Sequence, residues 1–148
     1  MGTYIFGYGS LLSRVSRHRT FVESVLHENV EFKGYQRILN ACCDDYLVMN
    51  IQPHKDVSIW GVVAKVVAED FPALREREYG YDLIEVTEAI SIEVGAPTYA
   101  FIVREPKCVG VPVSHEYLET CLSDVPVAEH AQWLNDTVST EDLSQPDT

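Results

Sequence analysis

Runs of β-branched and aromatic residues alternate along the chain with segments of helical spacing. Six runs rich in Val, Ile, Tyr and Phe are typical of strands: residues 4–7, 30–39, 46–51, 58–67, 83–94 and 98–103. Four segments favour helices: residues 15–27, 71–78, 114–122 and 127–134. Because strands outnumber helices and several follow one another directly, the pattern predicts an α+β domain with a mixed or barrel-like sheet.

Turn-forming residues separate these elements, and the end of the chain has a different composition. Loops are expected where proline or glycine stands beside polar residues, at residues 53–56, 95–97 and 105–107. From residue 135 the chain is polar and acidic, which favours a disordered tail. Because no linker or repeat interrupts the remainder, we expect one domain over residues 1–134 and a tail over residues 135–148.

The chain carries a net charge of −12, from 11 Lys and Arg against 23 Asp and Glu. Such a surface repels phosphate backbones and anionic lipids, which argues against nucleic-acid and membrane partners. No apolar run is long enough to span a bilayer, and no basic leader with a cleavage site is expected. The four cysteines, Cys42, Cys43, Cys108 and Cys121, contain no C-x-x-C pair. We therefore expect a reduced, cytoplasmic protein.

The stretch FGYGSLL, residues 6–12, loses strand propensity abruptly where two glycines flank a tyrosine. A dinucleotide-binding fingerprint needs a third glycine, and Leu12 stands in its place. Two interpretations remain. Gly7 and Gly9 either supply only the backbone freedom of a tight turn, or expose successive backbone N–H groups to an anionic ligand. Under the second interpretation, Ser10 adds a hydroxyl group to the site.

A carboxylate is predicted to face the interior from a short helix near the middle of the chain. Asp70 suits the N-cap and Pro72 suits the first turn, so a helix is expected to begin there. Glu78 follows Leu74 by four residues and lies on the same inward stripe, whereas Glu76 points away. A buried carboxylate needs a partner or a raised pKa. The alternative is a helix that frays before Glu78 and leaves it at the surface.

Together, FGYGSL after the first strand and LREREYGYDLIEV, residues 74–86, resemble the γ-glutamyl cyclotransferase-like superfamily. This superfamily includes AIG2-like proteins and cation-transport-regulator-like enzymes that degrade glutathione. The segment SIWGVVAKV, residues 58–66, is similar to a central strand of the family; its Gly61 would weaken a strand unless something packs closely there. The resemblance covers most of residues 3–122 and implies a small mixed β-barrel flanked by helices.

The resemblance also implies an activity that needs no metal or cofactor. In this family the α-amine of a small γ-glutamyl substrate attacks its own γ-carbonyl, which releases 5-oxoproline and an amine. Carried over to this chain, Glu78 is the catalytic acid/base. Main-chain N–H groups of a turn, here named the clamp turn, hold the γ-glutamyl group; the clamp turn consists of Tyr8, Gly9, Ser10 and Leu11. The alternatives are a γ-glutamylamine-type cyclotransferase and a non-catalytic small-molecule-binding relative.

Further candidates lie outside these two motifs. Arg14 and Arg17, three residues apart in the basic cluster SRVSRHRT, either meet a substrate carboxylate or form a solvated helix face. Tyr81 either lines the pocket or packs in the core. Cys42 and Cys43 are expected in a strand. No metal site is expected, because the cysteines and histidines lack the paired spacing of a zinc site. The oligomeric state is left open.

Overall fold

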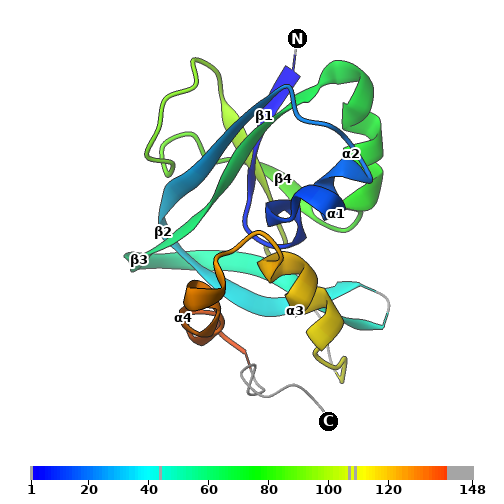
Figure 1. Ribbon diagram of the computed structural model, residues 1–148, viewed down its shortest axis with the longest axis vertical. Helices are drawn as coiled ribbons and strands as arrows, with labels where there is room; N and C mark the ends of the chain where they lie inside the picture. The colour runs from blue at the N-terminus through cyan, green and yellow to red at the C-terminus, as the bar shows by residue number, and fades with distance from the viewer. Residues whose placement is uncertain (1, 44, 107, 109, 140–148) are drawn as a thin grey trace.

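A five-stranded mixed sheet forms the centre of the computed structural model, which describes residues 2–43, 45–106, 108 and 110–139 (Figure 1). Its strands are β1 (Gly2–Gly7), β2 (Val25–Cys43), β3 (Tyr46–Val67), β4 (Asp82–Glu85) and β5 (Thr98–Ile102). The strand order is β2-β3-β1-β5-β4, with β1 parallel to β5 and the other neighbours antiparallel. β1 is thus the central strand, and it ends at Gly7, directly before the clamp turn.

Both faces of β1 are buried. Successive side chains of a strand point to opposite faces, so Ile5 packs in one cluster with Leu74 and Phe101. Phe6 packs in the other cluster, where its ring lies 4.5 Å from that of Phe32. The strand that carries the clamp turn is thus held from both sides.

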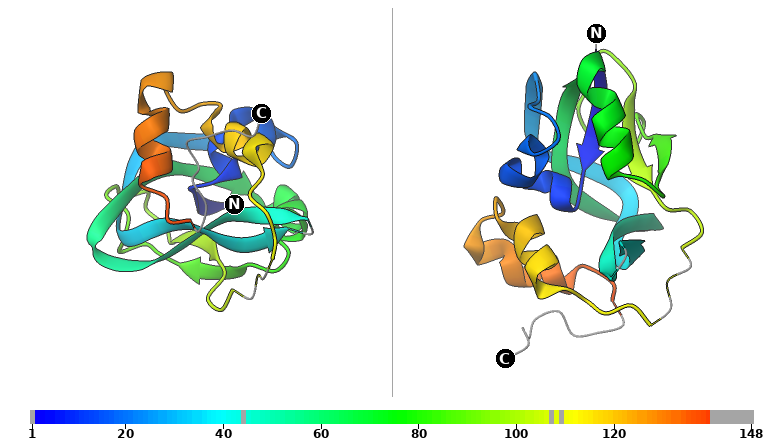
Figure 2. Two further views of the ribbon diagram at one scale, coloured as in Figure 1. Left: turned by 90° about the horizontal axis from the view of Figure 1, so that it is seen from below. Right: turned by 90° about the vertical axis from the view of Figure 1, so that its right-hand side faces the viewer.

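Helices lie at two ends of the sheet (Figure 2). The α-helices of the described chain are α1 (Arg14–His18), α2 (Phe71–Arg77), α3 (His115–Leu122) and α4 (His130–Asn135). Short 3-10 helices occur at Ser10–Leu12, Ala68–Asp70 and Val127–Glu129. Helices α1 and α2 lie near one end of the molecule, and α3 and α4 lie against the far part of the long β2–β3 hairpin (Figure 1).

The predicted α+β class and mixed sheet are confirmed, and β1, β5, α2 and α3 begin and end within a few residues of the predicted bounds. Among the described strands the order is open, with β2 and β4 at its edges, rather than closed into the expected barrel. Asp70 is the N-cap of α2 and Pro72 lies in its first turn, although the Asp70 side chain makes no capping hydrogen bond.

The helix predicted over residues 15–27 is wrong beyond His18. Helix α1 ends there, and Val25 already belongs to β2, where it pairs with Lys65 of β3. Pairing with a neighbouring strand outweighs the helical spacing of residues 22–27, because strand preference depends strongly on tertiary context.

Two other predicted boundaries are corrected along the sheet. Residues 53–56, expected as a loop, are part of β3, and Pro53 pairs with Tyr35. β1 pairs only with the last part of β3, so Pro53 sits where the strand has one neighbour, a position that proline tolerates. Conversely, the strand expected over residues 83–94 ends at Glu85, and beyond it only Ile90 forms an isolated bridge.

The folded part extends beyond the predicted domain boundary. Asn135 ends α4, and Val138 forms a parallel bridge with Ile38 of β2. Residues 135–139, assigned from composition to the tail, therefore belong to the fold. Residues 140–148 lie outside the described part of the chain.

Cys42 and Cys108 form a disulfide bond, with their Cα atoms 5.8 Å apart. The expectation of a fully reduced chain is therefore wrong for this pair. The two residues are 66 positions apart, and only the fold brings them together. Cys42 lies in β2, as expected, and the cytoplasmic location stays a prediction. No helix in the described ranges is long and apolar enough to cross a membrane.

Candidate active site

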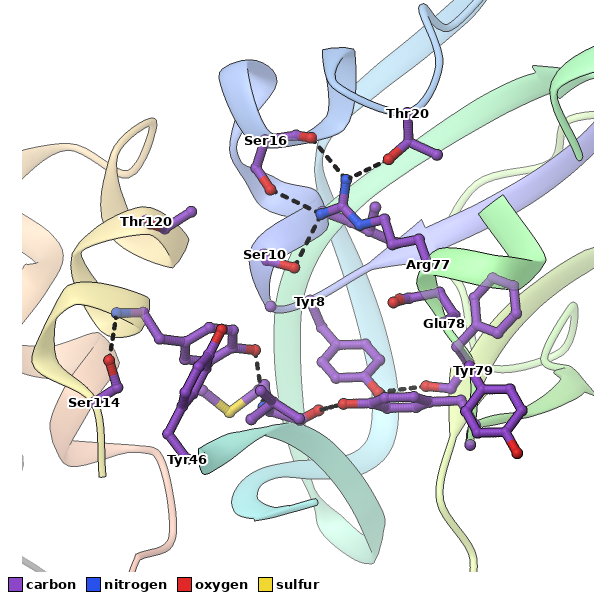
Figure 3. A pocket seen from close by; sticks show the side chains of 18 of the residues that line it. Tyr8, Ser10, Ser16, Thr20, Tyr46, Arg77, Glu78, Tyr79, Ser114 and Thr120 are labelled. Atoms are coloured by element: carbon purple, nitrogen blue, oxygen red, sulfur yellow. Dashed lines mark hydrogen bonds between the residues drawn. The ribbon is translucent and has the colours of Figure 1, made fainter. Parts of the chain in front are cut away.

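A cavity of about 780 Å³ lies between the clamp turn, the ends of α1 and α2, the start of β3, and α3 (Figure 3). Most of the residues singled out by the sequence patterns line this cavity: Tyr8, Gly9, Ser10, Leu11, Glu78 and Tyr81. Two motifs that are far apart in the sequence thus share one concave site, which is the usual form of a small-molecule site.

The clamp turn is a tight bend that continues into a 3-10 helix. The N–H of Leu12 donates to the carbonyl of Gly9 at 3.0 Å, which leaves the amides of the three preceding residues without a partner inside the turn. A Cβ on Gly9 would lie 2.9 Å from the Cβ of Met49 and 3.2 Å from the hydroxyl of Tyr117. Glycine therefore lets the turn approach β3 and α3 closely, while the N–H groups of Gly9, Ser10 and Leu11 have no backbone partner among the described residues.

The strand behind the clamp turn also depends on close packing. A Cβ on Gly61 would lie 2.2 Å from the carbonyl oxygen of Gly7 and 2.7 Å from the ring of Phe6. The close approach expected from a glycine inside this strand is therefore observed. It allows β3 to support the end of β1 directly, just before the chain enters the clamp turn.

Two tyrosine hydroxyl groups of the cavity are bonded to backbone carbonyls. Tyr8 donates to the carbonyl of Phe101, and Tyr81 donates to the carbonyl of Met49 at 2.6 Å (Figure 3). Burial raises the pKa of Tyr8 well above its ordinary value, and the nearby Tyr81 and Glu78 raise it further. Tyr8 therefore stays a neutral donor, and its ring forms an apolar wall near the Glu78 carboxylate.

Glu78 is the C-cap residue of α2, and its side chain lines the cavity. Its N–H donates to the carbonyl of Leu74 at 3.0 Å, which keeps the two residues on one stripe. Leu74 is buried, Glu78 is half-buried and Glu76 is exposed, in agreement with their spacing. Burial raises the pKa of Glu78 from 4.5 to about 7, although the charge of Arg77 opposes the rise. At neutral pH both protonation states of this carboxyl group are populated.

Arg77 connects the end of α2 to the clamp turn. Its Nη2 donates to the hydroxyls of Ser10 and Ser16 at 3.0 and 2.8 Å. Its Nη1 donates to the carbonyl of Ser16 at 2.7 Å and to the hydroxyl of Thr20 at 3.1 Å (Figure 3). The residue that precedes Glu78 is thus anchored to the clamp turn, and this anchor sets the position of the carboxylate relative to the turn.

The arginines of the basic cluster occupy three different environments. Arg14 is exposed and is not part of the cavity lining. Arg17 is buried, pairs with Glu23 at 2.7 Å and donates to the carbonyl of Leu11 at 2.9 Å, so it supports the clamp turn from behind. Arg19, which the sequence patterns did not single out, lines the cavity. The spacing argument selected Arg14 and Arg17 because they are three residues apart, whereas Arg19 is the C-cap residue of α1.

The opposite wall contains residues that no local pattern identified. The rings of Tyr46 and Tyr117 lie 5.8 Å apart, and the hydroxyl of Tyr117 accepts a hydrogen bond from the N–H of Met49 at 2.8 Å. Glu116 of α3 and Ser114, the N-cap residue of this helix, also line this wall. These side chains meet only through contacts between β3 and α3, which the sequence does not reveal.

Comparisons with known proteins give structural neighbours only. No model of a known protein family matches the chain, and no curated protein matches it. A solved γ-glutamyl cyclotransferase is 15% identical, with 95% of this chain and 91% of that one covered and a TM-score of 0.72. A human protein described as uncharacterized is 16% identical, covers 95% and 90% of the two chains, and has a TM-score of 0.71.

A further neighbour is a yeast γ-glutamyl cyclotransferase specific to glutathione. It is 16% identical, with 91% of this chain and 95% of that one covered and a TM-score of 0.59. At such identities the likeness shows the fold. The chain therefore shares the fold of these cyclotransferases over more than nine-tenths of its length, with a mixed sheet that is open and not the closed barrel that the resemblance implied.

Proposed function

We propose that the chain is a γ-glutamyl cyclotransferase-like enzyme that releases 5-oxoproline from a small γ-glutamyl compound. The observation that carries the proposal is the Glu78 carboxyl group, with a pKa of about 7, in the same cavity as the clamp turn. The fold shared with solved cyclotransferases supports the same reaction class.

The proposed reaction begins with the α-amine of the γ-glutamyl group, which is mostly protonated at neutral pH because its ordinary pKa is ~8. Deprotonated Glu78 accepts a proton from this ammonium group, and the free amine attacks the γ-carbonyl carbon. A C–N bond forms and the carbonyl π electrons move to oxygen. The amides of the clamp turn stabilise the resulting negative charge, because they are fixed before the reaction and need no reorganisation.

The tetrahedral intermediate then collapses, and the bond between the γ-carbon and the leaving nitrogen breaks. The attacking nitrogen loses two protons in all, and Glu78 relays them to the leaving nitrogen, which departs as an ammonium group. A carboxyl group with a pKa near the operating pH suits this relay, because its protonated and deprotonated forms then have similar free energies.

A γ-glutamylamine-type activity is the second candidate, and the α3 wall favours it. That wall presents Ser114, Glu116, Tyr117 and Thr120 to the cavity, and none of these four side chains is basic, while His115 of α3 is not part of the lining. Such a wall favours a neutral or cationic leaving amine over one that carries a carboxylate. The matched pair γ-glutamyltyramine and γ-glutamyltyrosine differs by that carboxylate alone. Faster release from the tyramine compound supports this candidate, and a preference for the dipeptide contradicts it.

Replacing the carboxylate tests the proposed chemistry. Glu78→Gln keeps the size of the side chain but removes its proton-accepting oxygen, so we expect 5-oxoproline release to fall by about 10²–10⁴-fold. Glu76→Gln, on the exposed face of the same helix, is expected to keep full activity. Full activity in folded Glu78→Gln protein would refute the proposal. Thermal stabilisation of the unsubstituted protein by 5-oxoproline, without turnover of any γ-glutamyl compound, would instead support a non-catalytic binding relative.

A further inference from the structure

Two arginines line the cavity, and they differ in their partners. The terminal nitrogens of Arg77 donate to Ser10, Ser16 and Thr20. The guanidinium group of Arg19 is exposed and makes no hydrogen bond or ion pair with any residue that the structure describes. Arg77 donates to Thr20, which directly follows Arg19; burial is the main cause that lowers the pKa of Arg77, and the nearby charge of Arg19 lowers it further. Arg19 is therefore a cation whose donors have no partner among the described residues, and it lies on the same side of the cavity as Arg77, the residue preceding Glu78.

The chemistry of a γ-glutamyl substrate places an anion on this side. The α-amine and the α-carboxylate share one carbon atom, so an amine that approaches Glu78 brings its carboxylate into the same region. Two carboxylates at close range repel each other unless a cation lies nearby. The terminal nitrogens of Arg77 already donate to Ser10, Ser16 and Thr20, whereas those of Arg19 donate to no residue in the described part of the chain.

We propose that Arg19 binds the α-carboxylate of the γ-glutamyl group. The identity of this ligand rests on the proposed function. A guanidinium group matches a carboxylate with two parallel hydrogen bonds. The chain has a net charge of −12, so a local positive charge is needed to attract an anionic group into the cavity. Arg14, the sequence-based candidate for this role, lies outside the cavity lining and becomes the matched control.

Steady-state kinetics test the assignment. Arg19→Ala is expected to raise KM by about tenfold while kcat changes by less than about twofold, since the lost contact exists before and during the reaction. Arg19→Lys keeps the charge but not the two-pronged geometry, so its KM should fall between those of the unsubstituted and Ala proteins. Arg14→Ala removes the same charge from the same region and should leave KM unchanged. An unchanged KM in Arg19→Ala, or an equal rise in both Ala variants, would overturn the assignment.

A binding experiment separates this inference from the proposed reaction, because the product retains the α-carboxylate. Calorimetric titration compares 5-oxoproline with 5-oxoprolinamide, which lacks the charge. The unsubstituted protein should bind the acid more tightly, by about tenfold, and Arg19→Ala should lose this preference. An Arg19-dependent preference without turnover would reject the proposed function and keep the carboxylate site. Turnover without that preference would reject the site and keep the function.

Discussion

At the scale of single residues, Glu78 combines partial burial with an ionisable group that no described residue hydrogen-bonds. Its carboxylate loses hydration without a replacement donor, and this loss raises the pKa. The charge of Arg77 offsets only part of the effect. The ionised form of Glu78 is therefore held in the folded protein at a cost in stability. The same desolvation raises the pKa of Glu78 toward neutral pH, where a carboxyl group can work as a base.

The cost predicts how stability depends on pH. The pKa of Glu78 rises from 4.5 in its ordinary environment to about 7 in the folded protein, so the folded state binds this proton more tightly than the unfolded state. The resulting stabilisation is complete below about pH 4.5 and is lost as the pH rises through about 7. Relative to Glu78→Gln, the native protein should lose up to about 3 kcal/mol of unfolding free energy across this interval.

Chemical denaturation of both proteins at several pH values between about 5 and about 8 measures this difference. Glu76→Gln is the control, since Glu76 is exposed on the same helix. The difference between native and Glu78→Gln protein should grow with pH and then level off. A difference of the same size at every pH would mean that Glu78 is not desolvated in solution.

At the scale of elements, the end of α2 and the clamp turn act as one unit. Arg77 bonds to the hydroxyl of Ser10 in the turn and to Ser16 and Thr20 around α1. Because Arg77 directly precedes Glu78, any change in these bonds moves the carboxylate relative to the clamp turn. Displacements of ~1 Å between reacting groups can cost ~10²-fold in rate.

Arg77→Met should therefore lower kcat/KM by about 10²-fold. It should also move the rising limb of the pH–rate profile to higher pH, because removal of the positive charge lets the pKa of Glu78 rise further. Arg77→Lys keeps the charge but not the fork of donors, so it should lose rate without this displacement of the profile. Arg75→Met, an exposed change on the same helix, should affect neither. An unshifted profile in Arg77→Met would show that Arg77 has only a structural role.

The elements also show how far local patterns determine the fold and the site. The orientation of Glu78 follows from its spacing to Leu74, and the clamp turn follows from its two glycines, because both are local properties. The strand at Val25 depends on pairing with Lys65, which overrides helical spacing. The cavity positions of Arg19 and Tyr46 arise from where α1 ends and where β3 meets α3. Long-range pairing was therefore the part that the sequence did not reveal.

At the scale of the whole molecule, the cavity lies between α2 on one side and α3 on the other, and the clamp turn borders it and approaches α3 at Gly9. The hydroxyl of Ser123, just after α3, donates to the hydroxyl of Ser13 at 2.9 Å and joins the two sides. The disulfide bond is a second connection. It joins Cys42, which lines the cavity, to Cys108 in the connection between β5 and α3. The connection that leads into α3 is thus covalently linked to the sheet.

This connection predicts a stability effect that depends on the bond and not on the individual cysteines. Cys42→Ser, Cys108→Ser and the double variant should lose the same unfolding free energy, about 4 kcal/mol at most, since each opens the same link across 66 residues. A thiol reductant should lower the stability of the native protein by a similar amount, because Cys42 is exposed, and should leave the variants unchanged. Denaturant unfolding with and without reductant measures both effects. If the two single losses add in the double variant, or if the reductant has no effect, the bond does not form in solution and α3 is held by its noncovalent contacts alone.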